Sequence, residues 1–372
     1  MFRVFRGCGY IFLAWRYLEG ARVSFERSFA VALAALKQFI RQDVALDLGT
    51  ANTLLFLDGQ GVVLNKPTVI ALDLEGNVVS LGEDAKAFLG KTPPRIRVIR
   101  PLRNGVIEDF QAAGLFLRAI IESARRKRSV FSSRIVICIP SQLTQVEKRS
   151  LLEAARDVEF TKIYLLEEVM AAAIGAGLDV SEKRPVMVVD IGGGTTEVAV
   201  IAEMAYLFCR SRKIAGDEMD RAIMKFILEE FGLKIGPNTA EKIKWQIGSA
   251  PGSDYVLNDS IEIAGQDVAK QIPSSLRLTG SQVQKALAPV VRHVLEAVQD
   301  CVRSLSPELE REVRAQGILL TGGGSLLRGL PSLMSDTLKM KIRHSDSPLT
   351  TVVEGAGRTL SDFGFYGPVF VN

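Results

Sequence analysis

The sequence VVDIGGGTTEVAV, from Val188 to Val200, places three glycines and two threonines in a row inside a run of β-branched residues. Strand-forming residues on both sides of the glycines predict two antiparallel strands joined by a tight turn. Glycine permits positive φ in such a turn, and it lets backbone N–H groups approach a ligand without an intervening Cβ. Successive N–H groups there form a concave anion site, to which Thr195 and Thr196 add hydroxyl donors. The stretch therefore predicts an anion-binding hairpin.

An aspartate leads this hairpin, although a carboxylate cannot itself bind an anion. Asp190 is explained if a phosphate-bound divalent cation, or the water shell of that cation, lies beside it. The stretch DLGTANT, from Asp47 to Thr53, repeats the pattern with fewer glycines. Two such hairpins facing each other would clamp a polyphosphate from both sides. The alternative is that both turns are purely structural.

A third glycine run, ILLTGGGSLLRGL at residues 318–330, has the pattern of a strand, a turn and the start of a helix. Free N–H groups at a helix N-terminus suit the base, ribose or α-phosphate end of a nucleotide, and a packing loop is the alternative. The stretch TAEKIKWQIGSA, residues 239–250, is predicted to be helical. It places Glu241 and Lys244 three residues apart on one face, where a solvated ion pair is the default expectation.

Past Asp43, segments with the pattern of strands alternate with segments of helical pattern, and this order restarts at PVMVVD, residues 185–190. The chain has 372 residues, of which 47% are hydrophobic and 24% charged, so it is long enough for two ordinary domains. The repeat predicts a duplicated α/β fold with a cleft between its halves.

The N-terminal segment differs in charge from the rest. Residues 1–42 carry seven basic and two acidic residues, whereas the remainder is nearly neutral, which indicates an anionic partner surface, either membrane or nucleic acid. No apolar run in it is long enough to span a bilayer. Residues 22–41 predict an amphipathic helix suited to a membrane interface, with its apolar stripe formed by Phe25, Phe29, Leu33, Leu36 and Ile40. The alternatives are a helix packed on its own domain and a cleavable signal peptide.

Other chemistry is not supported by the motifs. The cysteines, Cys8, Cys138, Cys209 and Cys301, form no C-x-x-C pair, which favours reduced thiols over a disulfide framework. Residues 85–92 match the loose P-loop pattern. A P-loop follows a strand and leads into a helix, but here the preceding residues have a helical pattern and Pro93-Pro94 prevent a helix from starting promptly. This argues against a true P-loop. Motifs of hydrolase triads and structural zinc sites are missing from the sequence.

Together the two aspartate-led hairpins, the LTGGGSLLRGL run and EKIK resemble the actin/Hsp70/sugar-kinase ATPase superfamily. The segments DLGTANTLLF, IRPLRNGVI, TQVEKRS, MAAAIGAGL and VVDIGGGTTEVAVI are more similar still to the bacterial actins of the MreB family, over about residues 43–360. The resemblance implies an α/β, actin-like (ribonuclease H-like) duplicated fold, with two lobes of two subdomains each around a nucleotide cleft. It places the basic extension at 1–42, the first lobe at 43–185 with an insertion at about 72–107, and the second lobe at 186–372 with an insertion at about 220–312.

The resemblance also implies roles for matching residues, with ATP and Mg²⁺ as cofactors. Glu147 would orient the attacking water, and Asp190, with Asp47, would neighbour Mg²⁺ through water. The expected nucleotide contacts are Asp47, Gly49, Thr50, Ala51, Asn52, Gly192, Gly193, Gly194, Thr195, Gly216, Glu241, Lys242, Ile243, Lys244, Gly322, Gly323, Gly324, Ser325 and Leu326. From the sequence alone, Glu147 reads as an exposed glutamate at a helix start.

The chain departs from the family pattern at three positions. Val169 replaces a usual proline, Ala215 replaces a glycine, and Glu108 replaces a common alanine. The first two substitutions touch the predicted hinge helix and the rim of the nucleotide site, respectively. They therefore put the turnover rate and the nucleotide affinity in question. The loop RRKRSVFSSR, residues 125–134, stands where the family carries a membrane-inserting loop, with Val130 and Phe131 between basic groups; a solvated turn is the alternative.

The function implied is a slow ATPase coupled to assembly of paired, antiparallel filaments. These would lie in the cytoplasm on the inner face of the cell membrane and organise cell shape and peptidoglycan synthesis. The expected partners are further copies of the chain, the membrane, and membrane proteins of the cell-wall elongation or division machinery, and not nucleic acid. The alternative is a non-polymerising Hsp70-like or FtsA-like regulatory ATPase. A sugar kinase would need a sugar-binding aspartate and larger insertions, of which the sequence gives no sign.

Overall fold

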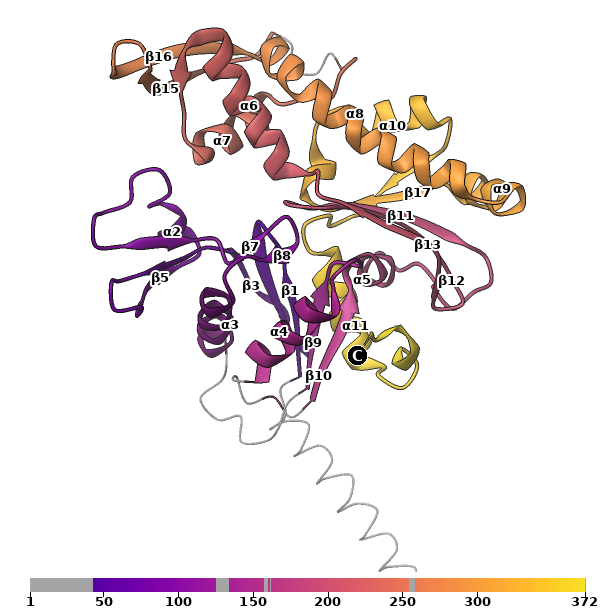
Figure 1. The fold of residues 1–372 in the computed structure, drawn as a ribbon. Helices are drawn as coiled ribbons and strands as arrows, with labels where there is room; N and C mark the ends of the chain where they lie inside the picture. Colours follow the sequence, from indigo (N-terminus) through magenta and orange to yellow (C-terminus); the bar gives the residue numbers. More distant parts are fainter. Residues whose placement is uncertain (1–42, 125–133, 157–159, 161, 254–257, 372) are drawn as a thin grey trace, which may run out of the picture.

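Two five-stranded sheets form the centre of the molecule (Figure 1). The computed structural model describes residues 43–124, 134–156, 160, 162–253 and 258–371. The first sheet has the order β10-β9-β1-β2-β3 and the second the order β13-β12-β11-β17-β18. The first contains β1 (Val44–Leu48), β2 (Asn52–Leu57), β3 (Gly61–Pro67), β9 (Arg134–Ile139) and β10 (Lys162–Glu167). The second contains β11 (Val186–Ile191), β12 (Thr196–Ala202), β13 (Ala205–Arg212), β17 (Ile318–Thr321) and β18 (Ile342–His344).

The two sheets repeat one pairing scheme. β1 runs antiparallel to β2 and parallel to β9, and β11 likewise runs antiparallel to β12 and parallel to β17. Both aspartate-led stretches are therefore hairpins whose first strand is central in its sheet. These strands are buried on both faces, which explains their almost continuous apolar sequences. The prediction of a duplicated α/β fold is confirmed.

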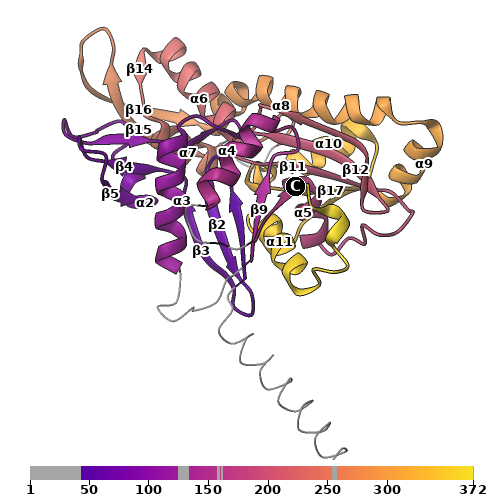
Figure 2. The same ribbon diagram turned by 60° about the horizontal axis from the view of Figure 1, so that its bottom comes forward.

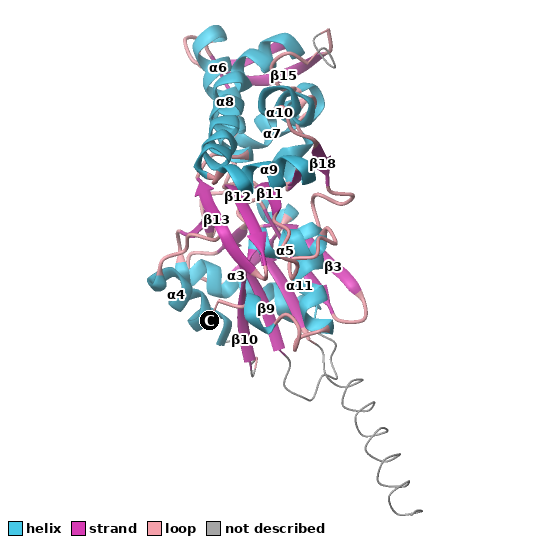
Figure 3. Ribbon diagram, turned by 90° about the vertical axis from the view of Figure 1, so that its right-hand side faces the viewer, coloured by secondary structure: helices cyan, strands magenta, loops and turns pink. Residues whose placement is uncertain are grey.

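Helices lie on both faces of each sheet. α5 (Glu168–Gly175) and α11 (Thr351–Ser361) lie between the two sheets (Figure 1). α3 (Phe110–Ala124) and α4 (Gln145–Arg156) cover the other face of the first sheet (Figure 2). α8 (Gly280–Ser304), α9 (Pro307–Gln316) and α10 (Leu330–Leu338) cover the outer face of the second (Figure 3). The chain thus builds layers, with the apolar core between them.

The crossing of α5 and α11 connects the two sheets. A Cβ on Gly175 would overlap the carbonyl oxygen of Thr351, and a Cβ on Gly355 would overlap that of Ala171. The two backbones are therefore in direct contact, which only glycine allows at both positions. Residues 43–185 and 186–372, called here the first and second halves, meet at this point.

Each half carries an insertion with a small sheet. In the first half β5 (Val78–Leu81), β4 (Ile70–Leu72) and β6 (Arg97–Ile99) pair and pack with α2 (Glu83–Lys86), and β7 (Leu102–Arg103) pairs with β8 (Val106–Ile107). In the second half β14 (Leu233–Lys234), β15 (Ser260–Asp267) and β16 (Ile272–Thr279) accompany α6 (Gly216–Phe231) and α7 (Pro237–Ile247). Residues 85–92 have only the short α2 and turns around them, and no P-loop fold.

The C-terminal residues return to the first sheet. α11 contacts β1 and β9, and Phe370 forms an antiparallel bridge with Leu166 of β10. A division of the chain at residue 185 therefore does not describe these last residues, and the predicted lobe boundaries stay a prediction.

The predicted membrane residues Phe25, Phe29, Leu33, Val130 and Phe131 lie outside the described residues. Within the part of the chain that the structure describes, no helix is long and apolar enough to cross a bilayer. Cys138, Cys209 and Cys301 are free thiols, as predicted for them.

Candidate functional site

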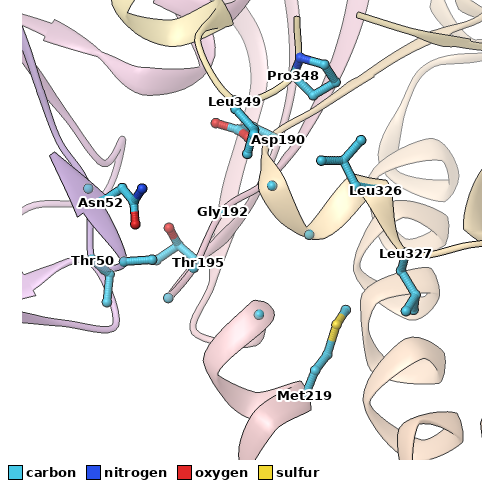
Figure 4. Close-up of a pocket in the computed structure, with 18 of the residues that line it drawn as sticks. Thr50, Asn52, Asp190, Gly192, Thr195, Met219, Leu326, Leu327, Pro348 and Leu349 are labelled. Carbon is cyan, nitrogen blue, oxygen red and sulfur yellow. The ribbon is translucent and has the colours of Figure 1, made fainter. Parts of the chain in front are cut away.

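A cavity of about 580 Å³ lies where the two hairpins, the third glycine run and helices α6 and α7 meet (Figure 4). Most of the residues predicted for the nucleotide and Mg²⁺ site line it. They are Asp47, Gly49, Thr50, Ala51, Asn52, Asp190, Gly192, Gly193, Gly194, Thr195, Gly216, Glu241, Lys244, Gly322, Gly323, Gly324 and Leu326. The volume is within the range of small-molecule sites.

The two hairpins touch at the bottom of the cavity. A Cβ added to Gly193 would stand 2.6 Å from the Ala51 methyl, and one added to Gly194 would stand 2.6 Å from the Thr50 hydroxyl oxygen. The same hydroxyl accepts a hydrogen bond from the Gly105 backbone N–H at 2.9 Å. Glycine at these turn positions therefore allows the second hairpin to reach the first, which is the facing arrangement that the sequence predicted.

Buried carboxyl groups lie behind the hairpins. Burial raises the pKa of Asp47 from its ordinary 3.8 to about 7. Burial, and then the charge of Asp47, raise the pKa of Asp190 to about 7. Burial, followed by the charges of Glu197, Asp47 and Asp190, holds the pKa of Glu168 well above its usual range. Burial away from water and the neighbouring acids both disfavour the ionised forms here.

These carboxyls fit a divalent cation. Oδ1 of Asp190 has no hydrogen-bond partner among the described residues, and a nearby cation would favour the ionised form of each acid. No three metal-ligating side chains gather closely enough in the described ranges to hold a metal by themselves. Contact through water, as expected for Asp47 and Asp190, stays a prediction.

The third glycine run closes the cavity beside Asp190. Gly322 has φ of +82°, and a Cβ there would overlap the Asp190 carboxylate, so both backbone conformation and space require glycine. A single 3₁₀ turn, η1 (Gly323–Leu326), follows β17 before α10 begins. The predicted strand–turn–helix order is thus confirmed, with the short turn inserted.

Helix α7 forms one rim of the cavity, and its charges pair differently from the prediction. Lys244 bonds to Asp220 at 3.0 Å and to the Gly216 carbonyl at 3.1 Å. Glu241 pairs with Lys86 of α2, so this ion pair joins the insertions of the two halves. The expected solvated pair between Glu241 and Lys244 is therefore wrong, because each side chain finds a half-buried partner elsewhere in the fold.

The other rim of the cavity is apolar (Figure 4). This surface, from α6, η1 and the segment before α11, suits the flat face of a nucleobase. Its residues are Met219, Leu326, Leu327, Pro348, Leu349 and Val352. Of these only Leu326 was predicted, and Glu168 and Trp245 were not, because no local sequence pattern marks residues that only the fold brings together.

Four predicted residues do not line the cavity. Ile243 is fully buried in the core, and Lys242 on the same helix is exposed. Ser325 is buried, donating to the Gly322 carbonyl at 2.6 Å and bonding to His344 Nε2 at 2.9 Å. Ser325 therefore stabilises the η1 turn from its buried side and does not face the cavity.

Glu147 is the fourth, and its carboxylate is engaged elsewhere. Oε2 accepts from the Thr144 backbone N–H and hydroxyl, both at 2.7 Å, while the Glu147 N–H donates back to the hydroxyl at 3.3 Å. This is a capping box at the start of α4, and its T-x-x-E signature was readable in the sequence. The role of Glu147 in orienting water stays a prediction.

The three departures from the family pattern have structural partners. Val169 is fully buried in α5, and Ala215 is 1% exposed in the core beside α6. Glu108 pairs with Arg103 at 3.2 Å on the surface. The first two side chains add apolar contacts next to the hinge helix and the cavity rim.

Comparisons with known proteins agree with this geometry. The sequence profile of the family described as MreB/Mbl protein matches residues 41–366. The chain is 40% identical to the cell shape-determining protein MreB of Escherichia coli (strain K12), over 89% of this chain and 98% of that protein. It is 37% identical to the cell shape-determining protein Mbl of Bacillus subtilis (strain 168), over 86% of this chain and 96% of that protein.

Solved structures agree as well. The crystal structure of MreB 5 of Spiroplasma citri bound to AMPPNP aligns with a TM-score of 0.82 at 30% identity, covering 87% of this chain and 97% of that chain. The MamK double helical filament aligns with a TM-score of 0.71 at 21% identity, covering 86% of this chain and 99% of that chain. The similarity to MamK supports the fold alone.

Proposed function

Because the chain belongs to the MreB/Mbl family and has the actin-like fold, we propose that it is an ATP-binding, ATP-hydrolysing cytoskeletal protein. It would form filaments on the inner face of the cytoplasmic membrane and organise cell shape and peptidoglycan synthesis. One observation carries the nucleotide part of the proposal. The two hairpins meet over buried carboxyls in a cavity of about 580 Å³.

Binding follows from the groups that face the cavity. Backbone N–H groups of the hairpins, with the Thr50 and Thr195 hydroxyls, offer donors to the phosphates. The apolar rim, including Met219 and Leu349, would pack against the base. When bound, Mg²⁺ supplies neutralisation of the phosphate charge, and Asp47 and Asp190 would hold its waters. The relative from Spiroplasma citri was solved with AMPPNP and with ADP, which supports a nucleotide as the occupant.

Hydrolysis is the finer part of the proposal. Glu147 is assigned the orientation of water by family resemblance, and it must leave its capping box to face the cavity. Loss of such a cap costs about 1 kcal/mol, which the binding free energy of a nucleotide easily exceeds. The capping box would then be the resting position of Glu147 before the site closes.

Assembly and membrane attachment rest on the relatives and on the N-terminal sequence. The MreB and Mbl relatives are described as cell shape-determining. The basic stretch 22–41, with Phe25, Phe29 and Leu33, and the loop residues Val130 and Phe131 are the proposed anchors. Membrane proteins of the cell-wall machinery are the proposed further partners.

A non-polymerising regulatory ATPase is the competing function, since the same cavity would serve it. Sedimentation of the purified full-length protein with ATP, Mg²⁺ and anionic vesicles separates the two. Nucleotide-dependent pelleting with the vesicles is expected for the proposed function. Nucleotide binding without any pelleting, over a wide concentration range, would favour the regulatory ATPase.

A further inference from the structure

Glu197 is a buried carboxyl for which nucleotide binding gives no role. It is 1% exposed and does not line the cavity. It lies directly across the β11–β12 hairpin from Asp190 in the strand register, so both side chains project from the same face of the sheet. Two acids in that position repel each other, and a fold retains such a pair only with compensation.

The compensation comes from the other half of the chain. Oε1 of Glu197 accepts two hydrogen bonds from Ser141, one from its backbone N–H at 2.9 Å and one from its hydroxyl at 2.8 Å. Ser141 lies in the loop of residues 140–144 that leads from β9 into α4. Gly105 lies between this loop and the second hairpin, because a Cβ on Gly105 would stand 3.1 Å from Pro140 and 2.8 Å from the Thr195 methyl.

Glu197 therefore joins the strand that leaves one phosphate hairpin to the loop that carries α4 and Glu147. The two hydrogen bonds cross between the halves of the chain, and each favours the ionised form of a carboxyl whose pKa burial raises to about 7. We propose that Glu197 is a positioning residue, which sets the start of α4 relative to the second hairpin without itself touching nucleotide. This inference rests on the proposed ATPase function of the same site.

The conservative variant Glu197→Gln separates a positioning role of this side chain from a role of its negative charge. In Glu197→Gln the amide oxygen can still accept both Ser141 donors. Oε2 has no partner at full hydrogen-bond geometry among the described residues, and the Ser211 hydroxyl opposite it on β13 can accept from an amide nitrogen in its place. Glu197→Ala removes the acceptor altogether. Ser141→Ala keeps the backbone donor and loses the hydroxyl, and Ser150→Ala in α4 is the control, since its hydroxyl bonds only within that helix, to the Val146 carbonyl.

The experiment measures ATP turnover and KM for each full-length variant. Because small misplacements of a catalytic group are costly, we expect Glu197→Ala to lower kcat at least about tenfold with KM little changed. Glu197→Gln should keep kcat within about threefold of wild type, Ser141→Ala should be intermediate, and Ser150→Ala should match wild type. Adding Ser141→Ala to Glu197→Ala should cause no further loss, because both act through one contact.

Hydrogen exchange of the nucleotide-free protein provides a readout that needs no activity. The Ser141 amide should lose protection in Glu197→Ala and keep it in Glu197→Gln, while α3 is unaffected. If wild type binds but does not hydrolyse ATP, the proposed ATPase function fails and the exchange result still tests the positioning. A kcat loss in Glu197→Gln as large as in Glu197→Ala would overturn the inference in favour of a charge role. Unchanged kcat and unchanged Ser141 exchange in Glu197→Ala would overturn it outright.

Discussion

Gly193 of the second hairpin lies against Ala51 of the first, so closely that a Cβ on Gly193 would stand 2.6 Å from the Ala51 methyl. The turns of the two hairpins are thus in contact across the cleft. A side chain at Gly193 would push the halves of the chain apart in addition to entering the space for phosphate. The contact between the hairpins therefore requires glycine at position 193, as it does at position 194.

Gly193→Ala should consequently lower ATP affinity at least tenfold, since each lost charge-assisted contact costs about 1.5–3 kcal/mol. Gly236→Ala is the control, because a Cβ there would meet no atom within 4 Å and Gly236 does not line the cavity. Equilibrium binding of a fluorescent ATP analogue checks both. Equal affinities of the two variants would contradict the hairpin contact as the determinant.

The stability of the nucleotide-free protein should fall as pH rises towards 8. Asp47 and Asp190 have pKa values of about 7 in the fold against an ordinary 3.8, so the folded state holds their protons more tightly than the unfolded state. Their contribution to stability is complete below about pH 4 and is lost as the pH rises through about 7. Thermal melts in EDTA at pH 6 and pH 8 measure this.

Adding Mg·ATP should flatten that dependence, because a cation favours the ionised carboxyls. Asp190→Asn should flatten it without ligand. A wild-type melting temperature in EDTA that rises between pH 6 and pH 8 would show that the carboxyls are ionised in the empty site.

Lys86 should slow the exchange of nucleotide. Its ammonium pairs with Glu241 and lies 5.8 Å from the ring centroid of Trp245, two residues that line the cavity, and its carbonyl accepts from the Asn238 side chain at 3.1 Å. Lys86→Ala should speed nucleotide release severalfold, since half-buried ion pairs contribute on the order of 1 kcal/mol.

Trp245 is 65% exposed, so its fluorescence can report the opening in a Trp15→Phe background. Lys91→Ala, an exposed lysine on the same insertion, is the control, and identical release rates in both variants would exclude the contact as a gate.

Glu147→Gln should separate the two roles of that residue. Glutamine preserves a capping box, so the variant should fold and bind ATP as wild type does, while phosphate release should fall about a hundredfold. Glu147→Ala should show the same catalytic loss and, in addition, a melting temperature lowered by loss of the cap. Phosphate release at the wild-type rate in Glu147→Gln would show that Glu147 only caps α4 and does not orient water.

Membrane binding should depend on two elements outside the described residues. Deleting residues 2–41 should weaken binding of the protein to anionic vesicles, because each basic group near the surface contributes about 1 kcal/mol. Filaments should retain part of their binding through multivalency, and Phe131→Ser in the truncated protein should remove it. High salt should mimic the deletion more than the point substitution. Pelleting of the double variant at the wild-type level would place the anchor elsewhere.

The sequence was most informative where function depends on local chain conformation. The two aspartate-led hairpins and the third glycine run could be predicted because turn residues and strand patterns lie within a dozen positions. The partners of Glu241 and Lys244 could not, since Lys86 is distant in sequence and Asp220 lies on another helix. The buried acids Glu168 and Glu197 have no sequence signature of their own. Their environment exists only once the two halves of the chain meet.

The central claim is that the cavity between the two hairpins binds ATP. Calorimetric titration of Mg·ATP into the full-length protein, below the concentration at which it assembles, tests this most directly. We expect one site per chain, with an affinity reduced at least tenfold in Gly193→Ala and unchanged in Gly236→Ala. A wild-type protein that takes up no Mg·ATP, or that binds it equally well with alanine at position 193, would contradict the account.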